Sequence, residues 1–313
     1  MSVTFQDIEH AQTVLAGRIH RTPTFGSAAL GVSLKAELFQ KTGSFKVRGA
    51  LNKIASLSPE EKERGVITVS AGNAGQAVAW AAREEGVDAL IVTWRTADAL
   101  KLAAMRGYGA TVDTEADGPA TVFERLHEVM AETGRTLVHP FDDPLVIAGQ
   151  GTVGLEILED RPVPDVVLAG VGGGGLISGL AVVVKARNPN ARVIGVEPEG
   201  SDALRQALAA GHPVPVTPRT AADALTGPFA GDHCLEICTR LGVESVLVTE
   251  EELFEAFRWL YARTKLACEL GAAAGTAALL SGKVSVNEGE NVVVVVSGGN
   301  VAPEQAAAIL RGQ

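Results

Sequence analysis

The sequence predicts an α/β fold with two open, twisted and mostly parallel sheets flanked by helices. Short β-branched runs alternate with longer alanine-rich segments of helical period, which is the pattern of parallel strands joined by crossover helices. Of the 313 residues, 46% are hydrophobic, so the chain can bury a large core. Several predicted strands end in small polar loops, and loops in this position bind ligands in open α/β sheets.

The elements follow one another in a regular order. Residues 1–19 have Ile8, Ala11, Val14 and Leu15 at helical spacing and predict an amphipathic helix. The same residues lack a basic region followed by an apolar stretch, so we expect no signal peptide. Pairs of a strand and a helix are predicted at 66–69 and 76–84, 89–93 and 100–105, 165–169 and 176–187, and 193–196 and 204–210, with a buried strand at 292–296.

No internal repeat or long linker divides the chain. A second sheet must therefore form where the chain leaves one sheet and later returns to it. Residues 66–140 contain strand and helix units of their own. We predict a large domain from residues 1–65 and 141–313, with a small inserted domain at residues 66–140.

Charge, hydropathy and cysteine content exclude several kinds of partner. The formal net charge is -10, without a run of Lys or Arg, so we expect no nucleic-acid partner. The apolar stretches are shorter than the roughly 18 residues of a membrane helix, so we expect no membrane partner either. Cys234, Cys238 and Cys268 form no disulfide framework, which favours buried free thiols and a cytoplasmic location. With His233, the first two are too few for a metal site.

Three of the predicted strands lead into loops of small polar residues, at 70–73, 170–175 and 297–300. The second loop has four consecutive glycines. A backbone without side chains lets several N–H groups surround one anion, so this loop predicts a phosphate site. The glycines are Gly172, Gly173, Gly174 and Gly175.

The glycine loop also fits a second interpretation. Gly170, Gly172 and Gly175 satisfy the dinucleotide fingerprint, and Glu197 at the end of the next strand stands where a ribose-binding acid would. An NAD-dependent oxidoreductase is therefore an alternative. Nothing else in the chain indicates hydride chemistry.

A lysine near the N-terminus points to different chemistry. Lys46 lies between Phe45 and Val47, and apolar neighbours can desolvate an amine. A lysine that forms a Schiff base must be neutral when it attacks, which such surroundings promote. Lys46 is therefore a candidate catalytic residue.

Seven motifs occur together and in order. They are GSFKVRGA at 43–50, SAGN at 70–73 with Gln76, HPFDD at 139–143, GQGT at 149–152 with Glu156, GGGGLISG at 172–179, GVEP at 195–198 and SGGN at 297–300. In these motifs, over roughly residues 20–302, the chain resembles the threonine dehydratase and serine racemase family. The resemblance implies a tryptophan synthase β-like fold (fold type II) and pyridoxal 5'-phosphate (PLP) as cofactor.

The resemblance also implies roles for single residues. Lys46 would form the aldimine with the cofactor, Phe45 would lie beside the pyridine ring, and Asn73 would pair with the phenolic oxygen. The remaining cofactor contacts would come from Gly172, Gly173, Gly174, Gly175 and Leu176 at the phosphate, and from Ser297 and Gly298 at the pyridine nitrogen. The substrate would contact Ser70, Ala71, Gly72, Asn73 and Gln76.

The activity implied is β-elimination of L-threonine, L-serine or a related β-hydroxy amino acid to a 2-oxo acid and ammonium, which is an ammonia-lyase reaction. A β-replacement synthase and an amino-acid racemase on the same fold are alternatives. A hydroxyl at the pyridine nitrogen leaves the ring neutral, which suits elimination. Ala71 stands where related racemases have a second serine, and Phe141 where they tend to have asparagine. Both positions favour the dehydratase.

The chain departs from the family pattern at several places. Ala74 replaces a common histidine, and Glu269-Leu-Gly271 replaces a Glu-Pro-small triplet. Glu197 matches an acid that binds a divalent cation in many relatives, but the position of its usual partner is Ala203. Two roles for Glu197 therefore stay open: a ligand of Mg²⁺ or another cation, or an ordinary acid at the end of a strand. The family also suggests a homodimer.

Overall fold

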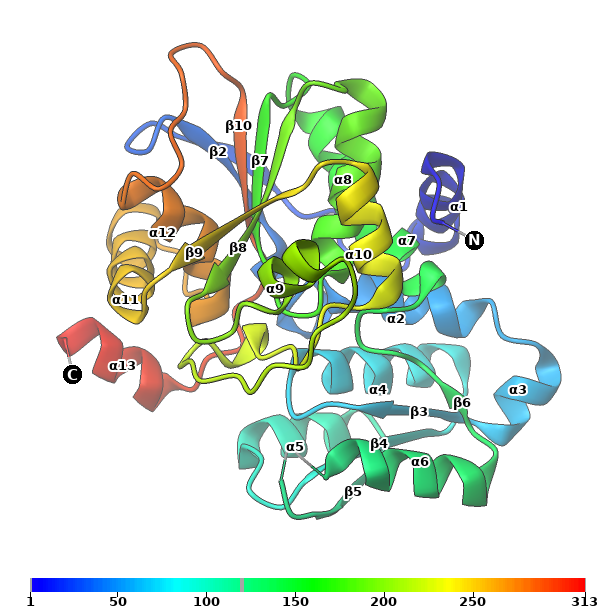
Figure 1. Ribbon diagram of the computed structural model, residues 1–313. Helices are drawn as coiled ribbons and strands as arrows, with labels where there is room; N and C mark the ends of the chain where they lie inside the picture. The colour runs from blue at the N-terminus through cyan, green and yellow to red at the C-terminus, as the bar shows by residue number, and fades with distance from the viewer. Residues whose placement is uncertain (1, 119–120, 313) are drawn as a thin grey trace.

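The computed structural model describes residues 2–118 and 121–312, which form two stacked layers of sheet and helix (Figure 1). The larger sheet has six strands in the order β1-β2-β10-β7-β8-β9, and the smaller sheet has four in the order β5-β4-β3-β6. Every pairing is parallel except that of β1 with β2. The predicted fold class is confirmed, with one antiparallel hairpin that was not predicted.

The two sheets draw on different parts of the chain. The larger sheet contains β1 (Thr24–Ser27), β2 (Val32–Ala36), β7 (Val166–Gly170), β8 (Arg192–Pro198), β9 (Glu244–Val248) and β10 (Val292–Val296). The smaller sheet contains β3 (Val66–Val69), β4 (Ala89–Trp94), β5 (Thr111–Ala116) and β6 (Thr136–Leu137). The last strand, β10, lies between β2 and β7 in the interior of the larger sheet.

The separate smaller sheet supports the inserted domain at residues 66–140, which we retain as a proposal. The proposed domain ranges include residues 1, 119, 120 and 313, which lie outside the described residues. Between the two sheets runs α2 (Lys46–Ala55), which packs against α4 (Asn73–Glu85) on one side and α7 (Pro144–Asp160) on the other. Helix α2 therefore connects the two layers.

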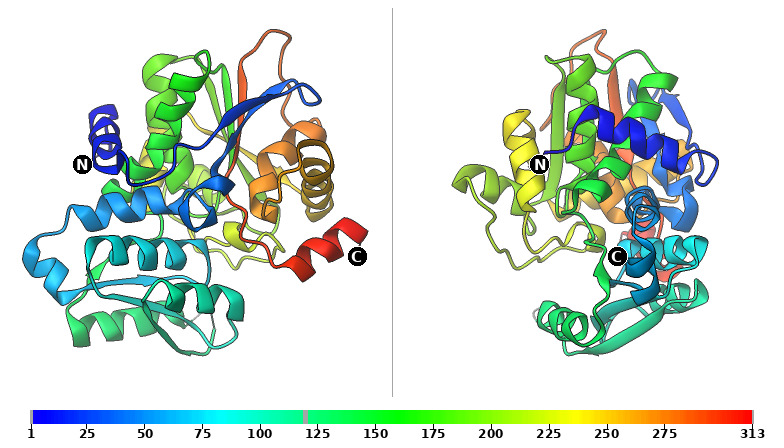
Figure 2. Two further views of the ribbon diagram at one scale, coloured as in Figure 1. Left: turned by 180° about the vertical axis from the view of Figure 1, so that it is seen from behind. Right: turned by 90° about the vertical axis from the view of Figure 1, so that its right-hand side faces the viewer.

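Both faces of the larger sheet are covered by helices, as Figure 2 shows from two further directions. Alternate valines of β10 face opposite layers: Val294 packs toward α11 and α12, and Val295 toward α7 and α8. This explains why a strand of five valines is buried throughout. One layer contains α7, α8 (Gly175–Arg187), α9 (Ala203–Ala210) and α10 (Asp232–Arg240), and the other α11 (Glu250–Trp259), α12 (Ala274–Leu280) and α13 (Pro303–Arg311).

The smaller sheet alternates in the same way. Val66 and Ile91 pack with α2, α4 and α5, whereas Ile67 and Val92 pack with α6. The helices of this layer are α4, α5 (Ala99–Gly107) and α6 (Val122–Thr133), and α3 (Pro59–Arg64) precedes β3. The strands β3 and β4 are thus buried on both faces, as their apolar sequences predict.

The first helix, α1, is shorter than predicted and covers Phe5–Leu15. It begins there because Thr4 and Asp7 form a capping box, in which each side chain accepts a hydrogen bond from the other residue's backbone N–H. Ile8 and Leu15 are buried as expected, and Val14 is half-buried. The predicted apolar face of the helix therefore packs against α7 and α8.

Two further expectations concern the thiols and the membrane. Cys234, Cys238 and Cys268 are free and buried, as predicted. Within residues 2–118 and 121–312, none of the helices combines the length and the apolar character that a bilayer crossing requires.

A buried ionic network fixes α2 in place. The guanidinium of Arg48 donates to Glu37 at 2.8 Å and to Glu156 at 2.7 Å, and Lys35 Nζ donates to Glu156 at 2.6 Å. Burial acts to raise the pKa of Glu156, but the hydrogen bonds and charges of Arg48 and Lys35 outweigh it, so the pKa is lowered. The network joins α2 to α7 and to a short 3-10 turn, η1 (Glu37–Phe39), that follows β2.

Replacing Arg48 with leucine is expected to lower the free energy of unfolding by about 3–5 kcal/mol, because it leaves the buried carboxylate of Glu37 without its cation and Glu156 with Lys35 alone. Arg21→Leu is the matched control, since Arg21 also contacts two acids, Glu159 and Asp160, but its side chain is 51% exposed. The control is expected to cost less than about 1 kcal/mol. Urea unfolding followed by circular dichroism measures both; equal losses would contradict a stabilising role for the buried network.

Candidate active site

Lys46 is the first residue of α2, and its amine lies in the space between the two layers. Its Nζ donates to the carbonyl oxygen of Pro140 at 2.8 Å. Part of the side chain remains exposed, but desolvation of the amine lowers its pKa to about 8, with Cys234 and Glu269 partly opposing the shift. A sizeable fraction of the amine is therefore neutral at slightly alkaline pH, which is the nucleophilic form.

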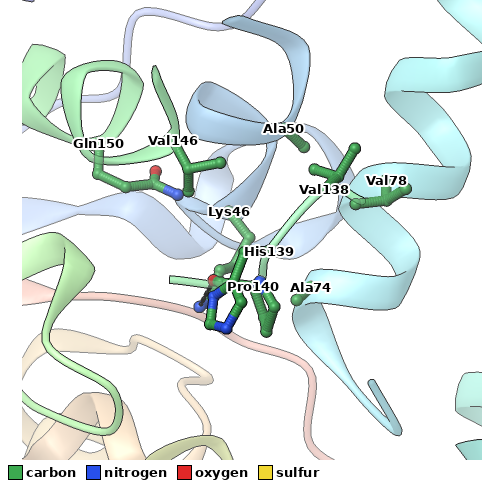
Figure 3. Close-up of a pocket in the computed structure, with 9 residues that line it drawn as sticks. All are labelled: Lys46, Ala50, Ala74, Val78, Val138, His139, Pro140, Val146 and Gln150. Atoms are coloured by element: carbon green, nitrogen blue, oxygen red, sulfur yellow. Dashed lines mark hydrogen bonds between the residues drawn. The ribbon is translucent and has the colours of Figure 1, made fainter. Parts of the chain in front are cut away.

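A cavity of about 10 Å³, which is room for roughly one water, lies beside Lys46. Figure 3 shows its walls, which come from α2, α4, α7 and the segment after β6. Ala74 on α4 faces His139 across this space. The lining residues are Lys46, Ala50, Ala74, Val78, Val138, His139, Pro140, Val146 and Gln150. The small side chain of Ala74 keeps this wall apolar.

The end of β10 lies next to the Lys46 segment. The N–H of Phe45 donates to the carbonyl oxygen of Ser297 at 3.2 Å, and Ser44 forms an isolated β-bridge with Gly298. The hydroxyl of Ser297 forms no hydrogen bond with the described residues, and only 4% of the residue is exposed. The structure therefore brings the predicted residues Phe45, Lys46, Ser297 and Gly298 together.

The tetraglycine loop presents free backbone donors. The amides of residues 172–176 donate to no acceptor in the described part of the chain. Side chains cannot fill this loop, because a Cβ at Gly173 would lie 2.2 Å from the Phe141 ring and Gly174 has a φ of +96°. Since α8 begins at Gly175, its positive end points into the same space. These donors fit a phosphate group, including that of PLP.

The loop after β3 offers a second set of donors. The N–H of Gly72 donates to Ser70 Oγ at 3.0 Å, and Gly72 caps α4 without a side chain. The amides of Ala71, Asn73 and Ala74 have no acceptor among the described residues. A carboxylate can bind to such a helix start. Gln76 lies one turn further along α4 and is buried.

Asn73 lies between two polar partners. Its Nδ2 donates to both carboxylate oxygens of Glu269, at 2.8 and 3.0 Å, and its Oδ1 accepts from Asn300 Nδ2 at 2.8 Å. Burial raises the pKa of Glu269 to about 7, although the hydrogen bond from Asn73 opposes the shift. The sequence analysis did not assign Glu269 to the site. The sequence did contain a signal for this role, because Glu269 is the acid of the altered triplet at residues 269–271.

His139 was also assigned no role from the sequence, although it begins the HPFDD motif. Its Nδ1 accepts from the N–H of Asp142 at 2.8 Å and from that of Phe141 at 3.3 Å. These bonds assign the ring proton to Nε2. Burial lowers the pKa of His139, so the ring is neutral at pH 7.

Glu197 is engaged in capping α9. Its carboxylate accepts from the N–H groups of Leu204 and Arg205, at 2.7 and 3.0 Å, and from Ser245 Oγ at 2.7 Å. These bonds leave it poorly placed to bind a ribose, which argues against the nicotinamide alternative. Within residues 2–118 and 121–312, no group of three or more His, Cys, Asp or Glu could hold a metal ion. Glu197 as a ligand of Mg²⁺ stays a prediction.

The chain is similar to known proteins over most of its length. A sequence profile of the pyridoxal-phosphate dependent enzymes matches residues 15–298. The L-threonine ammonia-lyase of Thermotoga maritima is 43% identical over 306 residues, which cover 96% of this chain and 76% of the relative.

Solved structures are similar over almost the whole chain. Maize serine racemase has a TM-score of 0.93 at 35% identity, covering 100% of this chain and 98% of that one. The serine racemase of Dictyostelium discoideum has a TM-score of 0.90 at 36% identity, covering 96% and 100%. The profile match, the identities and the shared fold together show that this chain belongs to the family of pyridoxal-phosphate dependent enzymes.

Proposed function

We propose that the protein is a PLP-dependent ammonia-lyase that converts L-threonine or L-serine to a 2-oxo acid and ammonium. The observation that carries the proposal is the desolvated amine of Lys46, whose pKa is lowered to about 8, in the same site as a loop of free amides. Relatives that bear the name L-threonine ammonia-lyase and threonine deaminase support the substrate class.

The bound cofactor supplies a conjugated ring that stabilises negative charge on the substrate α-carbon. In the proposal, the amides of residues 172–176 hold its phosphate, and Ser297 faces the ring nitrogen. A hydroxyl in that position would not protonate the nitrogen, and a neutral ring would suit elimination. Asn73, whose side chain is held by Glu269 and Asn300, would lie at the phenolic side of the ring.

Lys46 has two tasks in this scheme. Its neutral amine would hold the cofactor, and the same amine would accept the α-proton of the substrate as a general base. The loop from Ser70 to Asn73 binds the substrate carboxylate through its free amides. The overall balance for threonine is one 2-oxobutanoate and one ammonium, with the water lost at the β-carbon regained on hydrolysis.

Serine racemase is a second candidate, because a structure of that name superposes with a TM-score of 0.93. Ala71 argues against it, since a methyl group cannot donate a proton to the second face of the α-carbon. The β-replacement synthase is the third candidate, and it would need a thiol or similar nucleophile as a second substrate.

We also propose a homodimer, as the family suggests, and a cytoplasmic location, which the three free thiols support.

Lys46→Ala is expected to remove the visible absorbance of the lysine-bound cofactor and to reduce 2-oxo acid release by at least about 10³-fold, because in the proposal this amine is both the attachment point and the general base. Lys53→Ala, on the same helix and paired with Asp143, is the control and should retain both signals. After borohydride reduction, peptide mapping should find the pyridoxyl group on residue 46. A pyridoxyl group on any other lysine would refute the assignment.

The pH dependence of cofactor capture follows from the lowered pKa of Lys46. Only the neutral amine attacks, so its reactive fraction rises about tenfold per pH unit below a pKa of about 8 and is constant above it. The capture rate of cofactor-free protein is measured by absorbance and divided by the rate for Nα-acetyl-lysine at each pH. The ratio should stay level below pH 8 and fall above it. A level ratio up to pH 10 would mean that the amine is not desolvated.

Ala71→Ser is expected to raise D-serine formation from L-serine by about tenfold or more, because it adds a proton donor in the substrate loop. Ala71→Gly, which changes the same position without adding a proton donor, is the control. Chiral chromatography of the reaction measures D-serine, and ammonium release measures elimination. If the unmodified protein formed D-serine faster than ammonium, the racemase would replace the lyase as the proposed function.

A further inference from the structure

An ion pair crosses from the smaller layer to the larger one at the substrate loop. Lys101 on α5 pairs with Asp223 in a short 3-10 turn, η3 (Asp223–Leu225). That turn lies against the tetraglycine loop, since a Cβ at Gly172 would be 3.3 Å from the carbonyl oxygen of Ala224. The lysine side chain is 16% exposed, whereas the Asp223 side chain is 55% exposed. Lys101 therefore points inward from the small layer toward this edge of the site.

The ammonium of Lys101 also lies close to the substrate loop. A Cβ built on Gly72 would be 4.0 Å from Lys101 Nζ. Gly72 caps α4, so the free amides of Asn73 and Ala74 open next to the same ammonium. A full positive charge and a helix start thus converge on one small region, which is the combination that binds an anion.

We propose that Lys101 binds the α-carboxylate of the amino-acid substrate, and that Asp223 holds the Lys101 ammonium until the substrate carboxylate replaces it. The inference rests on the proposed function and adds a charged contact to a loop that otherwise offers only neutral donors. The substrate is zwitterionic, and its amine must reach Lys46. Its carboxylate then lies toward the substrate loop and Lys101.

The charges around the site favour this assignment. Glu269 is buried and accepts a hydrogen bond from Asn73 of this loop, so its ionised form repels an incoming carboxylate, and the nearby cation of Lys101 offsets that repulsion. Asp223 is the more exposed partner of Lys101, so it can return to solvent when the substrate takes its place. The exchange replaces one carboxylate by another and leaves the lysine paired throughout.

The test compares Lys101→Met with Lys62→Met in the holoenzyme. Lys62 is a matched control, because it too is a partly buried lysine paired with an acid, Glu85 at 2.7 Å, but it lies on α3. For each variant, ammonium release from L-threonine and from L-threonine amide gives KM and kcat. The amide keeps the reacting atoms and lacks the negative charge.

Lys101→Met is expected to raise KM for L-threonine about tenfold, with kcat within about twofold and KM for the amide unchanged, since one charge-assisted hydrogen bond is lost. Calorimetric titration with propionate should show binding about tenfold weaker than to the unmodified holoenzyme. Lys101→Arg should restore most of both. Lys62→Met should alter neither.

Asp223→Asn should lower KM for L-threonine, because it removes the competing carboxylate. A rise in KM for threonine and its amide alike, in either variant, would show that the pair only joins the layers and would overturn the inference. Unchanged KM and propionate binding in Lys101→Met would overturn it as well. If the unmodified enzyme showed no cofactor absorbance or released no ammonium, the proposed function itself would be refuted.

Discussion

The position of Lys46 depends on the buried charge of Arg48, two residues later on the same helix. A guanidinium without water requires partners on every side, and Glu37 and Glu156 supply them from two different elements. Because those elements are the turn η1 after β2 and the helix α7, the network fixes α2 relative to both. The first turn of α2 then projects the reactive amine into the gap between the layers.

The site keeps two ionisable groups away from water, and this burial shifts their pKa values in opposite directions. Desolvation makes the amine of Lys46 easier to deprotonate and the carboxyl of Glu269 harder to deprotonate. The opposite charges of the two groups also act on each other, raising the pKa of Lys46 and lowering that of Glu269, but burial has the larger effect on both. Glu269 also accepts a hydrogen bond from Asn73, which fixes the orientation of the Asn73 side-chain amide between the loops that follow β3 and β10. Burial and hydrogen bonding together thus set both the reactivity and the geometry of the centre.

Much of the architecture could be predicted from the sequence, because strands buried on both faces have continuous apolar runs. The strand at 292–296 and the helix starting near the tetraglycine loop agree with the structure to within a residue or two. The hairpin of β1 and β2 was missed, since β1 has no apolar alternation and β2, which does alternate, is only five residues long. Glu269 was missed for another reason. A buried acid looks like any surface acid until its tertiary partners are known, and Asn73 is distant in sequence.

The placement of β10 constrains how the protein is made. This strand is the last of the ten in sequence, yet β2 and β7 both pair with it. While the chain emerges from the ribosome, the larger sheet is divided until residues 292–296 are available, with an open edge on either side of the gap. The smaller sheet has no such delay, because residues 66–137 contain all four of its strands. Local pairing is therefore complete in one layer while the other still waits for its central strand.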